Sequence, residues 1–428
     1  MENPRIAIVG LGYVGLPLTL RFAEKGVRVL GLDVDTKKIE SLHSGQSYIK
    51  HIDASRIAEH FLTRKTATAS ADFSLVSGCE AVLICVPTPL NHNREPDLSY
   101  VFNTGAQIAP HLRKGMLVVL ESTTYPGTTD TDLRAILEKG SGLKAGTDFH
   151  LAFSPEREDP GNVNFTTSQI PKIVGGLTPA CRDRAVALYA RAIDRVVPVS
   201  SARVAEAVKL TENIFRSVNI AMVNELKVVF EKMDIDIWEV VEGAKTKPFG
   251  YMPFYPGPGL GGHCIPIDPF YLTWKAREYG MSTRFIELAG EINTSMPDYV
   301  VQRLILALNE NSRALKGSRI LLLGLAYKAN VDDDRESPSY VLMEKLEHLG
   351  ARVDYHDPHV PVIRPSREYA RYAGRRSQAL SAEALRSYEA VLLCTRHDDV
   401  DYALVAREAR LIVDTRNAFP KGPTVWKA

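Results

Sequence analysis

RIAIVGLGYVG, residues 5–15, joins a β-branched apolar run to three glycines in the pattern GxGxxG. Helix-forming residues follow up to Lys25, and Gly26 is expected to end that helix. Residues 27–32 form a second apolar run, which ends in Asp33. A strand, a glycine turn, a helix and a second strand within about 30 residues predict a βαβ unit.

Further apolar runs indicate that this unit begins a parallel sheet. They cover residues 80–86 and 115–120, and residues with helical character separate them. Near-continuous apolar strands separated by helices are typical of a parallel sheet that is covered on both faces.

The last third of the chain repeats this order. An apolar run is followed by a glycine and a helical stretch, and Asp357 then ends the next run as Asp33 does in the first unit. All α/β strands resemble one another, which is the alternative explanation, but the recurrence of several elements in the same order favours a structural repeat. The repeated segments are residues 319–323 with Gly324, a helical stretch that ends at Gly350, and the runs at 351–357, 389–394 and 411–414.

A helical region lies between the two α/β parts. Residues 202–233 contain almost no Gly or Pro, and residues 286–309 look similar apart from Pro297. Residues 247–262 are rich in Pro and Gly and are expected to form an ordered loop. The fold class we predict is α/β, with two Rossmann-like doubly wound domains joined by a central helical domain with a long helix. We place the domains at residues 1–198, 199–312 and 313–428.

Composition narrows the classes of function. The 428 residues are 45% hydrophobic and 24% charged, with a formal net charge of +1. No basic excess favours nucleic acid or an anionic membrane, and no apolar run is long enough to span a bilayer. Five scattered cysteines argue against a disulfide framework and for a reducing cytoplasm, where we expect the protein to reside without a signal peptide. No CxxC or HExxH pattern occurs, so we expect no metal site.

The first glycine turn predicts a dinucleotide site. Gly10 permits the tight turn, Gly12 lets the backbone approach a pyrophosphate, and Gly15 lets helix and strand pack closely. Asp33 can accept hydrogen bonds from both ribose hydroxyls and would repel a 2′-phosphate, which favours NAD over NADP. The alternative is a glycine turn that only packs. Residues 86–89 end a strand at the same edge and are expected to lie against the nicotinamide half.

Residues 254–269 form the segment with the clearest chemistry. Glycines and prolines precede Cys264, and a thiolate is a good nucleophile toward an aldehyde. Most free cysteines are buried and structural, which is our interpretation of Cys85 and Cys394. His263 could act as a base, but neighbours in sequence usually point in different directions.

Several motifs together resemble the UDP-glucose/UDP-mannose dehydrogenase family, and the resemblance covers essentially the whole chain. The loop before Cys264 is most similar to that of the branch acting on N-acetylated sugars, in particular the UDP-N-acetylglucosamine 6-dehydrogenases of surface polysaccharide pathways (O-antigen and capsule). The motifs are Gly10 to Gly15, Val86 to Pro89, Glu121-Ser122-Thr123, Ser154-Pro155-Glu156, Lys209 with Asn213, Gly261-Gly262-His263-Cys264, and Lys328 to Ser337.

The resemblance implies a double oxidation at C6 of the sugar with two NAD molecules. Cys264 would add to the first product, an aldehyde, and the resulting thiohemiacetal would be oxidised to a thioester that water hydrolyses. Lys209 and Asn213 are one helical turn apart and could stabilise the oxyanion of each step; the alternative for Lys209 is a solvated helix lysine. Asp268 would assist proton movement, and Glu156 is the candidate base for the hydrolytic water, positioned by Thr123.

The candidate site contains three groups of residues. The catalytic candidates are Cys264, Lys209, Asn213, Asp268, Glu156 and Thr123. The cofactor-binding candidates are Gly10, Gly12, Tyr13, Val14, Gly15, Asp33, Lys38, Pro87, Thr88, Thr123 and Arg335. The substrate-binding candidates are Glu156, Arg157, Lys209, Asn213, Lys247, Tyr255, Gly259, Gly261, Lys328 and Arg416. In this assignment residues 1–198 bind NAD, residues 199–312 carry the catalytic loop and a dimer interface, and residues 313–428 bind the UDP-sugar.

The chain departs from the family pattern at two places. Relatives supply an arginine to a neighbouring subunit from the loop before the cysteine, whereas this chain has Lys245-Thr246-Lys247, and a lysine cannot make a bidentate fork. The second glutamate after Ser-Pro-Glu is also displaced. Arg335 follows three aspartates, so a local ion pair is the alternative to a role in binding.

The sequence also allows other functions. The substrate could be UDP-N-acetylmannosamine, UDP-N-acetylgalactosamine or UDP-glucose. A two-electron dehydrogenase of the 6-phosphogluconate or hydroxyacid type would share the first domain but needs no loop cysteine. A non-catalytic NAD sensor would bind NAD without turnover. We expect a homodimer or higher homo-oligomer formed through the central helix.

Overall fold

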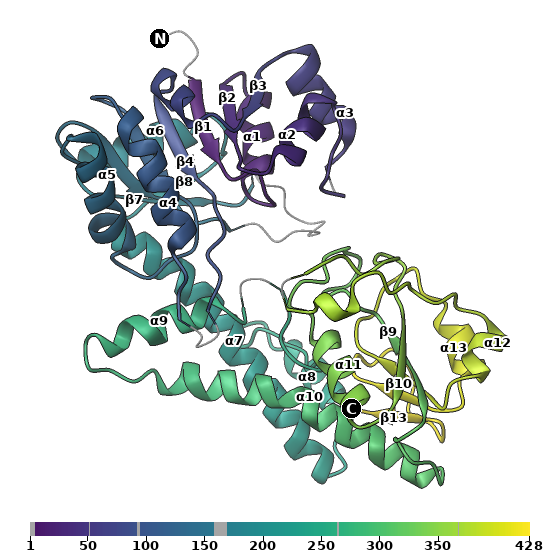
Figure 1. Ribbon diagram of the computed structural model, residues 1–428. Coiled ribbons are helices and arrows are strands. Elements are labelled where there is room, and N and C mark those ends of the chain that lie inside the picture. Colours follow the sequence, from purple (N-terminus) through teal and green to yellow (C-terminus); the bar gives the residue numbers. More distant parts are fainter. Residues whose placement is uncertain (1–4, 51, 92–94, 158–168, 263–264, 367) are drawn as a thin grey trace. The chain divides into compact units, whose positions relative to one another are not determined.

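The computed structural model describes residues 5–50, 52–91, 95–157, 169–262, 265–366 and 368–428. The chain forms two compact units, Met1–Glu212 with Phe270–Ser282, and Asn213–Pro269 with Thr283–Ala428. Figure 1 labels many of their helices and strands, and each unit is described by itself below.

The first unit is built on one sheet in the order β3-β2-β1-β4-β5-β6-β7-β8. All neighbours pair in parallel except β6 and β7, which are antiparallel, with Ala152 opposite Gly176. The strands are β1 (Arg5–Val9), β2 (Arg28–Leu32), β3 (Ala67–Ser70), β4 (Ala81–Ile84), β5 (Leu117–Leu120), β6 (His150–Phe153), β7 (Lys172–Gly176) and β8 (Val196–Pro198).

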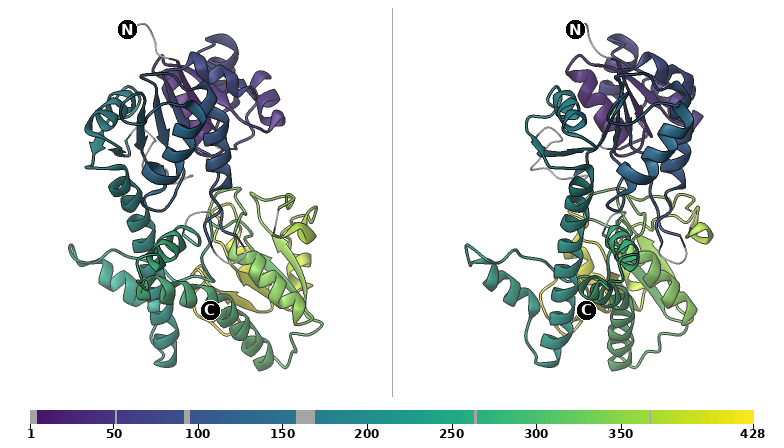
Figure 2. Two further views of the ribbon diagram at one scale, coloured as in Figure 1. Left: turned by 60° about the vertical axis from the view of Figure 1, so that its left-hand side comes forward. Right: turned by 90° about the vertical axis from the view of Figure 1, so that its left-hand side faces the viewer.

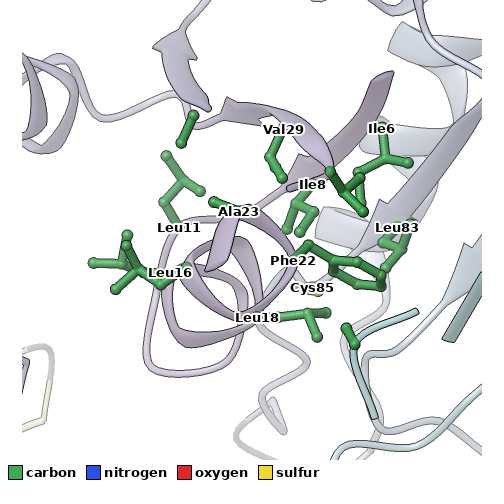
Figure 3. Close-up of a cluster of buried hydrophobic side chains, with 14 of the residues drawn as sticks. Ile6, Ile8, Leu11, Leu16, Leu18, Phe22, Ala23, Val29, Leu83 and Cys85 are labelled. Atoms are coloured by element: carbon green, nitrogen blue, oxygen red, sulfur yellow. The ribbon is translucent and has the colours of Figure 1, made fainter. Parts of the chain in front are cut away.

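Helices cover both faces of this sheet because alternate residues of its strands point to opposite sides. Ile6 and Ile8 of β1 pack with α1, α2 and α6, and Figure 3 shows this cluster around Phe22. Ala7 and Val9 pack with α4 and α5 on the other side. The helices are α1 (Gly15–Glu24), α2 (Thr36–His43), α3 (Ala54–Ile57), α4 (Ser99–Ile108), α5 (Arg134–Ser141) and α6 (Pro179–Tyr189).

The second unit contains a parallel sheet in the order β10-β9-β11-β12-β13. Ile320 and Leu322 of β9 pack toward α10 (Arg284–Glu310) and α11, whereas Leu321 and Leu323 pack toward α12 and α13. The strands are β9 (Arg319–Leu323), β10 (Arg352–His356), β11 (Ala390–Leu393), β12 (Ile412–Asp414) and β13 (Val425–Lys427), and the helices are α11 (Pro338–His348), α12 (Ala382–Arg386) and α13 (Tyr402–Glu408).

The predicted structural repeat is confirmed, down to the turn after the first strand. The order β2-β1-β4-β5 in one sheet matches β10-β9-β11-β12 in the other. Gly10 and Gly324 both have positive φ, and each donates its N–H to the last residue of the neighbouring strand, at 2.7 and 2.8 Å. Asp33 accepts from Leu11 N, just as Asp357 accepts from Leu325 N.

The region between the two α/β parts is helical, as predicted. It contains α7 (Ala202–Lys232), α8 (Ile237–Lys245), α9 (Asp268–Arg277) and α10 (Arg284–Glu310), with Pro297 inside α10. Figure 2 shows α7 as one unbroken helix. Residues 247–262 form no helix or strand. The domain boundaries at residues 198 and 312 stay a prediction.

Two features can be judged for the part of the chain that the structure describes. No helix among the described residues is long and apolar enough to cross a bilayer. The same residues contain no group of three or more His, Cys, Asp or Glu side chains that could hold a metal ion.

Candidate functional site

The three glycines of the turn after β1 are each required for a different physical reason. A methyl group at Gly10 would lie 2.7 Å from the Cys85 carbonyl, and one at Gly15 would lie 1.9 Å from the Gly10 carbonyl. At Gly12 a methyl group would meet no described atom within 4 Å. Among the described residues, the backbone at Gly12 is therefore open on the side where a ligand can approach, and no side chain of these residues caps the start of α1. This arrangement fits a pyrophosphate.

Asp33 is held rigidly at the end of β2. One carboxylate oxygen accepts from Leu11 N at 2.8 Å and from Lys38 Nζ at 3.0 Å, and the other accepts from Asp35 N at 2.9 Å. The predicted cofactor residues Asp33 and Lys38 are thus neighbours. Their contact places a fixed carboxylate beside the glycine turn, as the binding of a ribose diol requires.

The ends of β4 and β5 lie together at the carboxyl edge of this sheet. Ser122, directly before the candidate Thr123, donates its hydroxyl to Val86 O at 2.7 Å. Tyr271 of α9 donates to Thr88 O at 2.8 Å. In doubly wound sheets this edge is where ligands bind.

Glu156 follows β6 at the same edge. Its backbone carbonyl accepts from Lys209 Nζ at 2.7 Å, and its carboxylate oxygen Oε2 lies 3.2 Å from Lys172 Nζ. Lys209 is only 8% exposed, so the alternative of a solvated helix lysine is wrong. Arg157 donates to Glu212 at 2.6 Å, so its guanidinium makes an ion pair within this unit.

A buried charge cluster beneath Glu156 was missed by the sequence analysis. Lys172 Nζ lies 2.5 Å from Glu121 Oε2, and Tyr189 donates its hydroxyl to the other oxygen of Glu121. Burial raises the pKa of Glu121, and nearby Glu156 adds to the effect, whereas Lys172 opposes it. Burial alone lowers the pKa of Lys172, but the two carboxylates outweigh it and raise that pKa overall. The sequence feature that could have indicated this cluster is the lysine at the start of the apolar run Lys172–Gly176.

In the second unit, two catalytic candidates are in contact. The Asn213 amide donates to Asp268 Oδ2 at 2.5 Å, and both side chains are buried. Asn213 lies on α7 four residues after Lys209, so the two share one face of that helix. Asp268 lies within the predicted catalytic segment, residues 254–269, and is the first residue of α9.

The Pro-Gly loop packs against the last α/β part of the second unit. Gly257 donates its N–H to Asn224 of α7 at 3.0 Å, and a methyl group at Gly257 would lie 2.5 Å from the Arg416 guanidinium. Methyl groups at Gly261 and Gly262 would each lie 2.8 Å from Tyr327. These glycines therefore bring the end of the loop against the turn after β9.

The remaining substrate-binding candidates have local partners. Tyr255 stacks on Trp238 at 5.6 Å and donates to Glu242 at 2.6 Å, and Lys247 lies 5.2 Å from the Phe249 ring. Gly259 has a φ of 144° and packs on Pro338. Lys328 is half-buried in the turn after β9.

The guanidinium of Arg335 lies 2.7 Å from the Asp333 carboxylate. This is the local ion pair that the sequence analysis gave as the alternative to a role in binding. The role of Arg335 in cofactor binding stays a prediction.

Cys264 and His263 lie outside the described residues, so the roles given to them stay predictions. Cys85 and Cys394 are buried, which confirms the structural interpretation for both.

Comparison with known proteins gives consistent matches. The sequence profiles of the UDP-glucose/GDP-mannose dehydrogenase family match over residues 4–193 (NAD binding domain), 203–295 (central domain) and 321–421 (UDP binding domain). The predicted family resemblance is confirmed, with GDP rather than UDP as the carrier of mannose in the family's name.

Individual relatives cover nearly the whole chain. A UDP-N-acetyl-D-glucosamine 6-dehydrogenase of Pseudomonas aeruginosa is 35% identical over 93% of this chain and 92% of its own. An NDP-N-acetyl-D-galactosaminuronic acid dehydrogenase of Ralstonia nicotianae is 34% identical over 97% and 96%. The solved structure of a UDP-N-acetyl-D-mannosamine dehydrogenase of Pyrococcus horikoshii has a TM-score of 0.88 and 31% identity, covering 99% of this chain and 98% of its own.

Proposed function

Because the chain belongs to the UDP-glucose/GDP-mannose dehydrogenase family, whose members are NAD-dependent oxidoreductases, we propose that it oxidises C6 of UDP-N-acetyl-D-glucosamine to a carboxylate. The observation that carries the proposal is the hydrogen bond between Asn213 and Asp268. It joins an oxyanion-stabilising amide to a carboxylate that stands four residues after Cys264. A merely structural use of these residues gives no reason for a thiol, a lysine, an amide and an acid to occur together.

The proposed reaction runs in three stages. The C6 alcohol loses a proton and a hydride to give an aldehyde, and the Cys264 thiol adds to this aldehyde to form a thiohemiacetal. Loss of a second proton and hydride leaves a thioester, which water cleaves to the acid and the free thiol. NAD, when bound, accepts the hydride at each oxidation, so two NAD are reduced for each sugar.

Lys209 and Asn213 would stabilise the developing oxyanion at each stage. An ammonium and an amide from adjacent turns of one helix are suited to this task because they are fixed before the reaction begins. Asp268 would receive and return the proton of the thiol. Glu156, positioned by Thr123, would take the proton of the attacking water.

The P. aeruginosa relative supports UDP-N-acetylglucosamine as the substrate. The Ralstonia and Pyrococcus relatives are named for the galactosamine and mannosamine sugars, which makes their UDP derivatives the alternatives. The product would serve the synthesis of a surface polysaccharide. A comparison of kcat/KM for these three sugars and UDP-glucose tests the choice, and a higher value for any other sugar would replace our proposal.

The same assay separates the rival functions. With limiting sugar, two NADH per sugar support acid formation, whereas one indicates a two-electron dehydrogenase. NAD binding without NADH formation from any of the four sugars would indicate a sensor. Cys264→Ser should abolish normal acid formation, and near-normal turnover would refute the covalent mechanism.

We also propose that the chain forms a homodimer through α7. Phe215, Met222 and Val229 are exposed apolar side chains seven residues apart, so they lie along one stripe of the helix. Sedimentation velocity of the wild type and of Met222→Lys tests this proposal. We expect a dimer that the lysine weakens, and a monomeric wild type would refute it.

A further inference from the structure

The chain path explains how Lys172 comes to lie beside Glu156. Strand β7 is antiparallel to β6, so the first residue of β7 lies at the edge where β6 ends. Lys172 is that first residue, and Glu156 comes three residues after Phe153, the last residue of β6. The reversed direction of β7 therefore brings a lysine to the carboxyl edge of the parallel strands β1 to β6.

The lysine bridges two carboxylates that differ in access to solvent. Its Nζ lies 2.5 Å from Glu121, whose side chain is 0% exposed, and 3.2 Å from Glu156, whose side chain is 15% exposed. Glu121 is thus sealed in the interior, whereas Glu156 can meet a water molecule. An ion pair that served stability alone would need only the contact with Glu121.

Building on the role proposed above for Glu156, we propose that Lys172 and Glu121 are positioning residues that hold the Glu156 carboxylate in place and set the pH at which it becomes ionised. Lys172 favours the ionised form of Glu156, and Glu121 opposes it. Tyr189 fixes Glu121 through its hydroxyl, so the pair cannot turn away.

Other polar groups of the described residues also lie near Glu156. The ammonium of Lys209 binds the backbone carbonyl of Glu156, and the backbone N–H of Arg157 donates to Oε1 of its carboxylate. The thiol of Cys85 is buried below, where burial raises its pKa, so it stays neutral. Among these groups, Lys172 and Glu121 are the two whose charges can be removed without touching the backbone of Glu156.

The test uses two variants that should shift the pH at which Glu156 becomes ionised in opposite directions. Lys172→Met removes the positive charge, and we expect the acid limb of the kcat–pH profile to move up by about one pH unit or more. Glu121→Gln removes the negative charge while its amide keeps partners for Lys172 and Tyr189, and we expect the limb to move down. Lys114→Met is the matched control, because Lys114 pairs with Asp148 at the surface and should leave the limb unchanged.

A purely structural role predicts a different result. Both variants would then lower the plateau rate and leave the limb in place, or move it in the same direction, and either outcome would overturn the proposal. If Lys172→Met does not fold because the buried Glu121 carboxylate has lost its ion-pair partner, the double variant with Glu121→Gln removes both charges. Compared with Glu121→Gln alone, the double variant should shift the limb upward.

A second measurement needs no turnover. The ¹³C NMR titration of glutamate-labelled protein, with the Glu156 signal assigned by Glu156→Gln, should show the same opposite shifts. If the wild type oxidises none of the four UDP-sugars, the proposed function fails, and this titration still decides whether the pair controls Glu156.

Discussion

Gly12→Ala should separate the binding of NAD from the stability of the fold. The methyl group of the variant meets no described protein atom within 4 Å, and Gly12 is not among the glycines with positive φ. Where the backbone conformation is compatible, Gly→Ala stabilises by about 0.4–1 kcal/mol through the unfolded chain. The protein without cofactor should therefore melt at the wild-type temperature or slightly above it.

The cost should appear only when NAD is added, because the methyl group stands where the pyrophosphate must approach. We expect the Kd for NAD, measured by calorimetry, to rise at least tenfold. At a NAD concentration 100 times the wild-type Kd, the wild type gains about 2.7 kcal/mol of stability and the variant about 1.4 kcal/mol or less. Thermal melts with and without NAD measure this difference.

Gly15→Ala is the contrasting variant in the same turn. Its methyl group would lie 1.9 Å from the Gly10 carbonyl, which is backbone and cannot move cheaply. We expect a loss of about 3 kcal/mol or more of stability even without cofactor. If Gly12→Ala bound NAD as tightly as the wild type, the open face at Gly12 would not be the pyrophosphate site and the reasoning would be refuted.

Three further predictions concern single side chains. Asp33→Asn removes the charge that repels a 2′-phosphate, so the kcat/KM preference for NAD over NADP should fall tenfold or more; an unchanged ratio would exclude Asp33 from that choice. Burial raises the pKa of Glu206 from 4.5 to about 7. Between these two pKa values Glu206 is protonated in the folded state but ionised in the unfolded state, so the stability of the wild type falls as pH rises. In urea unfolding, Glu206→Gln should therefore gain about 3 kcal/mol relative to the wild type between pH 4 and pH 8. A stability difference that does not change with pH would argue against this titration. Asn213→Ala should lower kcat roughly 100-fold with little change in KM, and a loss confined to KM would assign Asn213 to substrate binding alone.

Much of the fold follows from local sequence patterns. The apolar run at residues 5–9, the glycine turn and the acid at position 33 each depend on neighbours close in the chain, and the structure has them where the sequence predicts. The repeat was visible for the same reason, because Asp357 stands after its strand as Asp33 does. The long helix at residues 202–232 needed only the absence of Gly and Pro.

Features that depend on the path of the chain could not be predicted in this way. Nothing in the composition of Lys172–Gly176 indicates that this strand runs antiparallel to β6, so the contact between Lys172 and Glu156 was hidden. Likewise, nothing in the sequence around Arg157 indicates that it pairs with Glu212, 55 residues away. Pairings of this kind are decided by tertiary packing, whereas the spacing of Asn213 after Lys209 is a helical property that the sequence shows directly.

The most direct test of the central claim is the mass of the protein itself during turnover. The wild type, mixed with UDP-N-acetylglucosamine and NAD and quenched in acid within the first turnovers, should carry the sugar nucleotide covalently on Cys264, and Cys264→Ala should carry none. Complete conversion of the sugar to its acid by Cys264→Ala, with no adduct on the wild type at any time, would contradict the account.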